Sequence, residues 1–137
     1  MTSHKTDMIK EIFDLARFIS SNQSDSNLTM IQLRTVMFIK NKGIVKPTEI
    51  AKQFSITPAS VTSQIDNLVR EGWIERKYNQ SDKRVIEVAL TSKGENWLPG
   101  EVKKLKEFCE PVFQVLNQKE QEILLALVLK INKAIKN

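Results

Sequence analysis

The chain has very few of the residues on which most catalytic and metal sites depend. Its 137 residues include one cysteine and one histidine, Cys109 and His4. A lone cysteine excludes an internal disulfide, and the two residues together are too few for a His/Cys metal site within one chain. One histidine also excludes most triads of the Ser–His–Asp kind. Because the sequence has no Gly-rich phosphate loop either, we expect neither an enzyme nor a protein that carries a metal or another cofactor.

Long apolar runs and a signal peptide are also missing. No run approaches the roughly 18–20 apolar residues of a membrane-spanning helix, and the N-terminus has no apolar segment with a cleavage site. We therefore expect a cytoplasmic protein with no membrane partner. Apolar residues make up 41% of the chain and charged residues 27%, which is typical of a globular domain. The formal charge of +5 favours an anionic partner only weakly.

Two short helices can be traced near the middle of the chain. The segment 47–54 predicts the first helix, and Ser55-Ile56 predicts a tight connector. Thr57 suits the N-cap of the second helix because its hydroxyl can accept a backbone N–H, and Pro58 suits the first turn. The spacing of three apolar residues predicts one inward stripe on this second helix, formed by Val61, Ile65 and Leu68.

A charged hairpin follows the second helix, which ends at Gly72. Apolar and polar residues alternate over 73–78 and 85–90, the pattern of half-buried strands. The connecting loop, 79–84, is polar and basic, and the pair 44–45 can add one brief strand beside the hairpin. A helix-turn-helix followed by a basic hairpin is typical of a winged helix. The predicted fold class is therefore mainly α with a small β-hairpin wing, flanked by helices at both ends.

The flanking segment on the N-terminal side contains two helices. An apolar stripe predicts a helix over 5–20, and the polar residues 20–27 predict a loop. Thr29 and Gln32 form a capping box that starts the next helix. Gly43 closes that helix as a residue in the left-handed αL conformation.

The C-terminal flanking segment also contains helices. Ser92, with a glutamate three residues later, starts the first of them. The pair 99–100 and Pro111 interrupt its periodicity, which predicts a kink or a break. Residues 117–120 form another capping box, after which the last helix is too apolar along its length to lie on a surface alone. Its stripe comprises Ile123, Leu124, Leu127, Val128, Ile131 and Ile135.

The order of these elements and a set of short motifs resemble the MarR family of transcriptional regulators. The motifs are Leu28-Thr29-x-x-Gln32-Leu33, Glu49-Ile50-Ala51, Ser60-Val61-Thr62 with Ile65-Asp66-x-Leu68, Glu71-Gly72, Asp82-Lys83-Arg84 and Leu90-Thr91-x-Lys93-Gly94. One family feature differs, because Ser55 stands where a glycine is common. The resemblance implies one domain over 1–137, with a winged-helix DNA-binding part at 28–95 and dimerisation helices at 1–22 and 96–137.

The same resemblance implies a function and its partners. We expect a homodimer that binds double-stranded DNA at a pseudo-palindromic operator and usually represses. Many members of the family release DNA when a small aromatic effector binds between the dimerisation and DNA-binding regions. The alternatives are a winged-helix module for protein–protein contact and a nonspecific architectural DNA binder. Sequence preference and salt dependence separate the three.

The candidate DNA-binding residues lie on the outer face of the second helix and at the hairpin tip. Short hydroxyl and amide groups can hydrogen-bond base edges, and an arginine at the tip suits the narrow minor groove. Asp82 can hold the Arg84 guanidinium by a charge-assisted bond, and Lys83 can reach a phosphate. We expect Asp66 to pair with Arg70, four residues on. The full set is Thr57, Ala59, Ser60, Thr62, Ser63, Asn67, Asp82, Lys83 and Arg84.

A ligand pocket is the second candidate site. Large apolar side chains near the junction of the two regions could line it, although ordinary core packing explains the same residues. They are Phe13, Met30, Met37, Phe38 and Trp97. We expect Cys109 to be a buried or interface thiol without chemistry. Candidate phosphate contacts, each of which could equally be a plain surface charge, are Lys40, Lys42, Lys46, Lys52, Arg70, Arg76 and Lys77.

Overall fold

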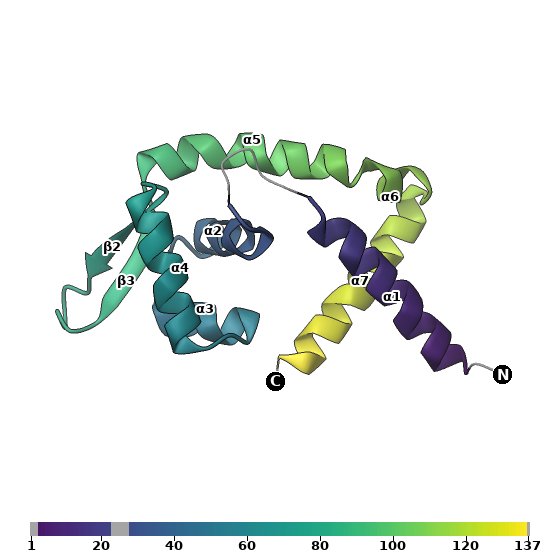
Figure 1. The fold of residues 1–137 in the computed structure, drawn as a ribbon, viewed down its shortest axis with the longest axis horizontal. Coiled ribbons are helices and arrows are strands. Elements are labelled where there is room, and N and C mark those ends of the chain that lie inside the picture. The colour runs from purple at the N-terminus through teal and green to yellow at the C-terminus, as the bar shows by residue number, and fades with distance from the viewer. Residues whose placement is uncertain (1–2, 23–27, 137) are drawn as a thin grey trace.

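The computed structural model describes residues 3–22 and 28–136, which form two lobes joined by one long helix (Figure 1). The winged-helix lobe contains α2 (Met30–Lys42), β1 (Ile44–Val45), α3 (Pro47–Phe54), α4 (Pro58–Arg70), β2 (Ile74–Tyr78) and β3 (Ile86–Leu90). From this lobe the chain runs through α5 (Ser92–Phe108) to the second lobe, formed by α6 (Glu110–Gln114), α7 (Gln118–Ile135) and α1 (His4–Ser20). The mainly helical fold with a small antiparallel sheet confirms the predicted class.

Two predicted capping boxes are confirmed. At the start of α2, Thr29 Oγ1 accepts the backbone N–H of Gln32 (3.2 Å) and Gln32 Oε1 accepts that of Thr29 (2.9 Å). Asn117 and Glu120 exchange the same pair of hydrogen bonds at the start of α7. These local bonds satisfy N–H groups that have no partner inside a helix, so the sequence alone fixes where both helices begin. The predicted loop at 20–27 lies mostly outside the described residues.

Two helix ends differ from the prediction. α5 is capped by Thr91 rather than Ser92, because Thr91 Oγ1 accepts the backbone N–H of Gly94 (3.1 Å) and Ser92 is already helical. Gly43 ends α2 with the positive φ of 91° expected of a glycine, but its ψ of −60° lies outside the αL region. The different turn lets β1 begin at the very next residue, Ile44.

The three strands pair antiparallel in the order β1–β3–β2. Ile44 lies opposite Ala89 and Ile74 opposite Leu90, so the brief strand predicted at 44–45 is confirmed. Ile74 is buried at the base of the hairpin, whereas Tyr78, at the other end of β2, is exposed. The hairpin is therefore packed at its base and free at its tip.

Of the kink or break predicted at 99–100, the break is absent, because α5 continues through Pro99. Pro99 is exposed, and its ring removes only one hydrogen bond of the helix. Its neighbours Leu98 and Glu101 are buried and hold the helix on both sides of the proline. The break predicted at Pro111 is confirmed, because α5 ends at Phe108 and a separate short helix follows.

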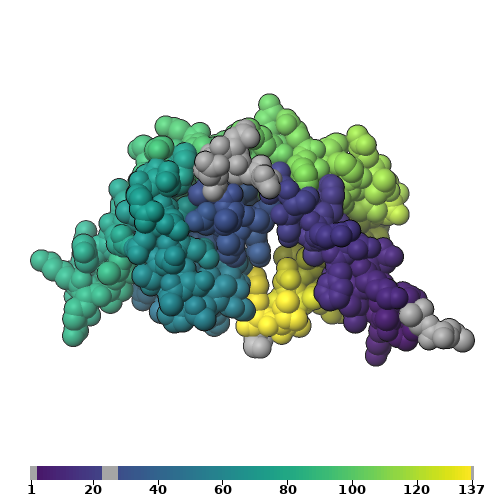
Figure 2. Space-filling model, viewed as in Figure 1, coloured from purple at the N-terminus to yellow at the C-terminus, as the bar shows by residue number. Residues whose placement is uncertain are grey.

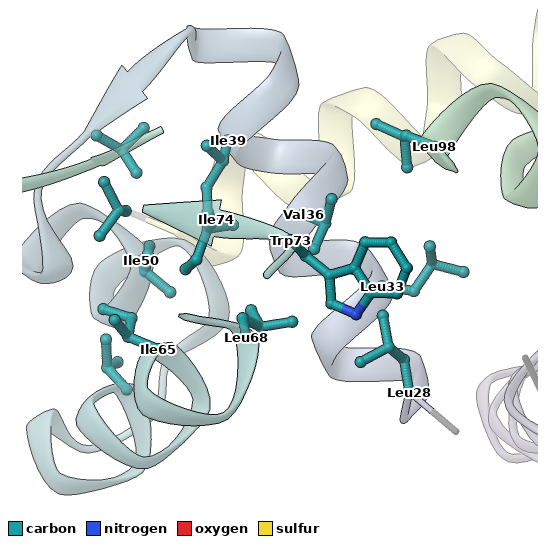
Figure 3. Close-up of a cluster of buried hydrophobic side chains, with 13 residues drawn as sticks. Leu28, Leu33, Val36, Ile39, Ile50, Ile65, Leu68, Trp73, Ile74 and Leu98 are labelled. Atoms are coloured by element: carbon teal, nitrogen blue, oxygen red, sulfur yellow. The ribbon is translucent and has the colours of Figure 1, made fainter. Parts of the chain in front are cut away.

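The buried core lies in the winged-helix lobe and at the start of α5 (Figure 3). The predicted inward stripe of α4 is confirmed, since Val61, Ile65 and Leu68 are each at most 4% exposed. They pack with α2, which contributes Val36 and Ile39, and with the base of the hairpin. This core fixes the winged-helix lobe as one unit and leaves the opposite face of α4 in solvent.

The terminal helices have no comparable core. The structure describes no buried residue in α1 or α7, and Figure 2 shows an opening between α2 and these helices. Large apolar side chains are exposed along both helices: Met8, Ile9, Ile12, Phe13, Leu15, Ile19, Ile123, Leu124, Leu125, Leu127, Val128, Leu129, Ile131 and Ile135. Among the described helices, none is both long enough and apolar enough to cross a membrane.

Two glycines of α5 provide a matched test of this packing. A Cβ on Gly94 would collide with the backbone carbonyl of Trp73, whereas a Cβ on Gly100 meets nothing within 4 Å. We expect Gly94→Ala to lower the free energy of unfolding by about 1–3 kcal/mol through overpacking. Gly100→Ala should raise it by up to about 1 kcal/mol, because alanine favours the helix. Urea denaturation measures both, and shifts in the same direction would contradict the collision.

Candidate nucleic-acid interface

The outer face of α4 is presented to solvent by a well-anchored helix start. Thr57 is the N-cap predicted from the sequence, and its Oγ1 accepts the backbone N–H of Ser60 (3.1 Å). Pro58 occupies the first helical position, also as predicted. On the inner side, Thr35 Oγ1 of α2 donates to Gln64 Oε1 (3.2 Å), which ties the middle of α4 to the core. The helix is thus held at its start and at its middle.

The predicted α4 residues differ in whether their side chains already form hydrogen bonds within the protein. The Thr57 hydroxyl is used in the cap, and Thr62 Oγ1 donates to the carbonyl of Pro58 (3.0 Å). Ser60, Ser63 and Asn67 make no side-chain hydrogen bond to other described residues. These three groups, beside the exposed methyl of Ala59, can meet a base edge with all their polar atoms, whereas Thr57 and Thr62 keep only part of their hydrogen-bonding capacity.

The connector before α4 carries the strain that the missing glycine implies. Ser55 has φ 53° and ψ 48°, the αL conformation, and among the described residues it alone has positive φ without being a glycine. Its backbone N–H bonds the carbonyl of Ala51, which ends α3. The turn adopts a conformation that favours glycine, which costs a residue with a Cβ free energy.

The wing tip is ordered by two acceptors. Asp82 accepts from Arg84 Nε (3.1 Å) and Nη2 (3.2 Å) and from the Arg84 backbone N–H (3.0 Å). Asn79 Oδ1 accepts the backbone N–H groups of Ser81 (2.8 Å) and Asp82 (3.2 Å). The Arg84 side chain is nevertheless 90% exposed. The loop therefore presents an oriented guanidinium to solvent, with Lys83 beside it.

The pairing with Arg84 also fixes the charge of Asp82. Hydrogen bonds from the Arg84 guanidinium, and then from its backbone N–H, lower the pKa of Asp82 below the ordinary value of 3.8. Because the pKa is lowered in the folded state, the pair stabilises the wing above that ordinary value. The contribution is lost as the pH falls through the lowered pKa. At neutral pH Asp82 is therefore ionised and able to accept from Arg84.

The prediction that Asp66 pairs with Arg70 is wrong. Its carboxylate accepts from the Arg76 guanidinium of β2 rather than from Arg70 on its own helix. Arg76 lies ten residues along the chain, and only the fold of the hairpin against α4 brings it close. The negative charge on the outer side of α4 is therefore neutralised from the wing.

The end of α4 is tied to the start of α5. Lys93 Nζ donates to the carbonyl of Glu71 (2.8 Å) at the C-terminus of α4 and lies 4.4 Å from the centre of the Trp73 ring. Thr91 Oγ1 donates to the carbonyl of Gly72 (2.5 Å). Sequence reasoning missed the roles of Asn79, Lys93 and Thr91. An Asn two residues before a serine is a weak signal of the turn, but the other two bonds join residues about 20 apart in sequence.

Three of the candidate phosphate contacts are already paired, and one of them is Arg76, bound to Asp66. Lys40 forms an ion pair with Glu95 (2.5 Å), and Lys77 lies 3.6 Å from Glu75. Both pairs are at the surface, where an ion pair contributes about 0–1 kcal/mol. A phosphate could therefore replace either acidic partner at little cost.

The predicted pocket residues are not brought together. Phe13 is 68% exposed on α1, and Trp97 stacks on Trp73 with 4.4 Å between ring centres. Phe38 meets Phe54 edge-on at 5.9 Å. Met30 lies at the start of α2, and Met37, farther along that helix, packs against the core. The structure thus distributes the five residues over separate contacts, which favours packing over a shared pocket.

Comparison with known proteins identifies the family of this arrangement. The MarR family model matches residues 28–86. The chain is 31% identical over 100 residues to the multiple antibiotic resistance protein MarR of Salmonella typhimurium, covering 65% of this chain and 69% of that protein. The chain belongs to the MarR family. Proteins of this family are DNA-binding transcriptional regulators and not enzymes, which confirms the class of function expected from the sequence.

Further relatives and solved structures agree. The chain is 37% identical over 70 residues to the HTH-type transcriptional repressor YetL of Bacillus subtilis, which covers 48% of this chain and 42% of that protein. The crystal structure of the transcriptional regulator SlyA superposes with a TM-score of 0.82 at 22% identity, covering 95% and 94% of the two chains. A mutant MarR from E. coli complexed with operator DNA gives 0.73 at 23% identity, with 93% and 94% covered. The MarR fold therefore extends over both lobes.

The Ser55 turn provides a test of the helix-turn-helix geometry. The αL conformation costs a non-glycine residue about 1–2 kcal/mol in the folded state, and a glycine avoids this cost. The glycine also makes the unfolded chain more flexible, which lowers the free energy of unfolding by about 0.4–1 kcal/mol. We expect Ser55→Gly to raise the free energy of unfolding by about 1 kcal/mol or less. Ser55→Ala, which keeps a Cβ, should bring no such gain. Chemical denaturation compares the two, and a destabilised glycine variant would contradict the strained turn.

Proposed function

We propose that this MarR-family protein is a homodimeric, sequence-specific regulator that represses by occupying a pseudo-palindromic operator in the cytoplasm. The observation that carries the proposal is that one lobe exposes two elements suited to DNA, the outer face of α4 and the wing. The outer face of α4 offers free hydroxyl and amide groups, and the wing offers Arg84, exposed yet held by two bonds to Asp82. In a winged helix these elements suit the major groove and the adjacent minor groove.

The outer face of α4 and the wing differ in the kind of DNA contact that their side chains can make. Ser60, Ser63 and Asn67 can hydrogen-bond base edges, but none can make the bidentate guanine contact of an arginine. Arg84 supplies the strong charge of the site, and a guanidinium is favoured where the minor groove is narrow and its potential most negative. Lys83 is placed to neutralise a phosphate. Affinity should therefore depend heavily on the wing, and sequence preference on both elements.

Dimerisation accounts for the exposed apolar helices. The stripes of α1 and α7 have no cover in the described chain, and burial of apolar surface contributes about 25 cal/mol per Å². A second copy that presents the same stripes would cover them. Two α4 helices related by a two-fold axis could then enter major grooves about one DNA turn apart, ~10 bp.

The direct test is binding to labelled DNA from upstream of the gene, with a scrambled duplex alongside at fixed salt. Arg84→Ala should weaken binding to the upstream DNA about tenfold or more, because it removes the minor-groove guanidinium. Asp82→Asn should weaken this binding less, since Arg84 remains but loses the ion pair that orients its guanidinium. Lys5→Ala, which removes the same charge far from the wing, is the matched control.

Each rival function predicts another result. A nonspecific architectural protein would bind both duplexes alike with a steep salt dependence. A protein-binding module would bind neither. If Arg84→Ala and Lys5→Ala gave equal losses, the wing would contribute only general charge, and its role as a reader would be wrong.

A groove between α2 and α5 supports regulation by a small aromatic acid. Its volume is about 430 Å³, with an apolar wall that includes Leu98 and Val102 and with three lysines, Lys40, Lys103 and Lys106. Glu95 lines the same groove and holds Lys40. A carboxylate ligand could compete for that lysine while its ring lay on the apolar wall. The groove joins an element of the winged-helix lobe to the connecting helix, so a ligand there could bias their relative position.

A matched pair of ligands tests this groove. Calorimetric titration should show that benzoate binds at least about tenfold more tightly than the uncharged isostere benzamide, because only the acid pairs with a lysine. Val102→Trp, which fills the apolar wall, should abolish benzoate binding. Equal affinities, or binding unaffected by the tryptophan, would exclude the groove as the effector site.

A further inference from the structure

We infer that Asp66 and Arg76 form a positioning pair that fixes the wing relative to the outer face of α4. The inference rests on the proposed function and goes beyond it, because neither side chain is assigned there as a reader. The carboxylate of Asp66, on α4, accepts from the guanidinium of Arg76, on β2. Their side chains are 50% and 35% exposed, so the bond lies at the surface between the two readers.

The chain between the two residues explains why such a bond matters. α4 and β2 are joined by a short turn at Gly72, whose φ of 83° only a glycine adopts freely. A single turn is a hinge, about which a hairpin could rock. Asp66 lies six residues before Gly72 and Arg76 four residues after it. The ion pair therefore closes a ring across the hinge, on the side that faces solvent.

The remaining supports of the wing lie elsewhere. β3 pairs with β1 at the base of the hairpin, through Ala89 and Val88. Lys93 and Thr91 hold the carbonyls on either side of the turn. The β1 pairing ends at Val88, which lies opposite Arg76 in the register. Along β2, Arg76 lies between the buried base at Ile74 and the exposed end at Tyr78. Its bond to α4 therefore holds the β2 edge of the sheet, opposite the edge that β1 holds.

Charge gives the pair a second consequence. An unpaired Asp66 next to Asn67 would place a negative charge against the DNA backbone. Bound to Arg76, it presents a neutral pair, and Arg76 is kept from binding phosphates of any sequence. A surface pair of this kind adds little to folding stability. Its effect should appear in the discrimination between DNA sequences.

The test is a double-mutant cycle on DNA discrimination. The quantity measured is the ratio of affinities for upstream and scrambled DNA, for the wild type, Asp66→Asn, Arg76→Gln and the double variant. We expect each single variant to lower the ratio about fivefold, and the double variant to lower it no further, since either change breaks the same bond. Arg76→Lys should restore part of the ratio.

A matched control separates this role from simple charge. Glu75→Gln frees Lys77 on the same strand, where the Glu75–Lys77 pair (3.6 Å) does not reach α4, and should leave the ratio unchanged. If Arg76 merely contacted phosphate, Arg76→Gln would weaken both duplexes alike, lower the salt slope by about one, and add to the effect of Asp66→Asn. That outcome would overturn the inference.

Amide hydrogen exchange in DNA-free protein keeps the inference testable whether or not the proposed function holds. Exchange of the β2–β3 amides should accelerate in Asp66→Asn and Arg76→Gln, and stay unchanged in Glu75→Gln. Faster exchange in a protein without DNA preference would sustain the positioning pair and reject the proposed function. Unchanged exchange in a protein with normal DNA preference would reject the positioning pair and sustain the proposed function.

Discussion

The close packing of the start of α5 against the turn at Gly72 and Trp73 is the contact on which the arrangement of the two lobes depends. Gly94 has no side chain because the Trp73 backbone occupies the place of a Cβ. Around that contact, Thr91 and Lys93 hold the last carbonyls of α4 and its turn, and Trp97 stacks on Trp73. One small region thus joins the end of α4, the first strand of the wing and the helix that leads to the second lobe.

This junction can transmit movement, because its residues belong to α4, to the start of the wing and to α5. A rotation of α5 cannot be absorbed by loose side chains where backbone touches backbone, and packed interiors resist small displacements. The movement would pass to the turn and so to the hinge between α4 and the hairpin. A regulator with this construction can respond to a change at α1 or α7 without any ligand near the DNA. The groove beside Lys40 lies along the same route.

The sequence predicted those features whose cause is local. Thr29, Thr57 and Asn117 begin helices because a side-chain acceptor meets an N–H three residues later, and the α4 stripe is buried because its spacing matches a helix. Prediction failed where distant residues compete. Asp66 has a plausible partner four residues along its own helix, but the hairpin brings Arg76 to it. Pro99 reads as a break until Leu98 and Glu101 are seen to hold the helix from both sides.

The modest chemistry of the α4 face explains why geometry should matter so much in this protein. A hydroxyl makes a weaker base contact than an arginine fork, and the bidentate contact that Asn67 can make to adenine depends on close alignment. A small displacement of the helix therefore forfeits a large share of the discrimination available. The strongest charge, Arg84, sits at the end of an exposed hairpin, where its position is most sensitive to rocking at the base. Under the proposed function, sequence preference then depends on holding the α4 face and Arg84 at a fixed separation. The position of the wing then depends on the packing of the Gly72 turn against α5, on the paired wing tip and on the bond between Asp66 and Arg76. A protein with arginines on α4 would depend less on these three contacts.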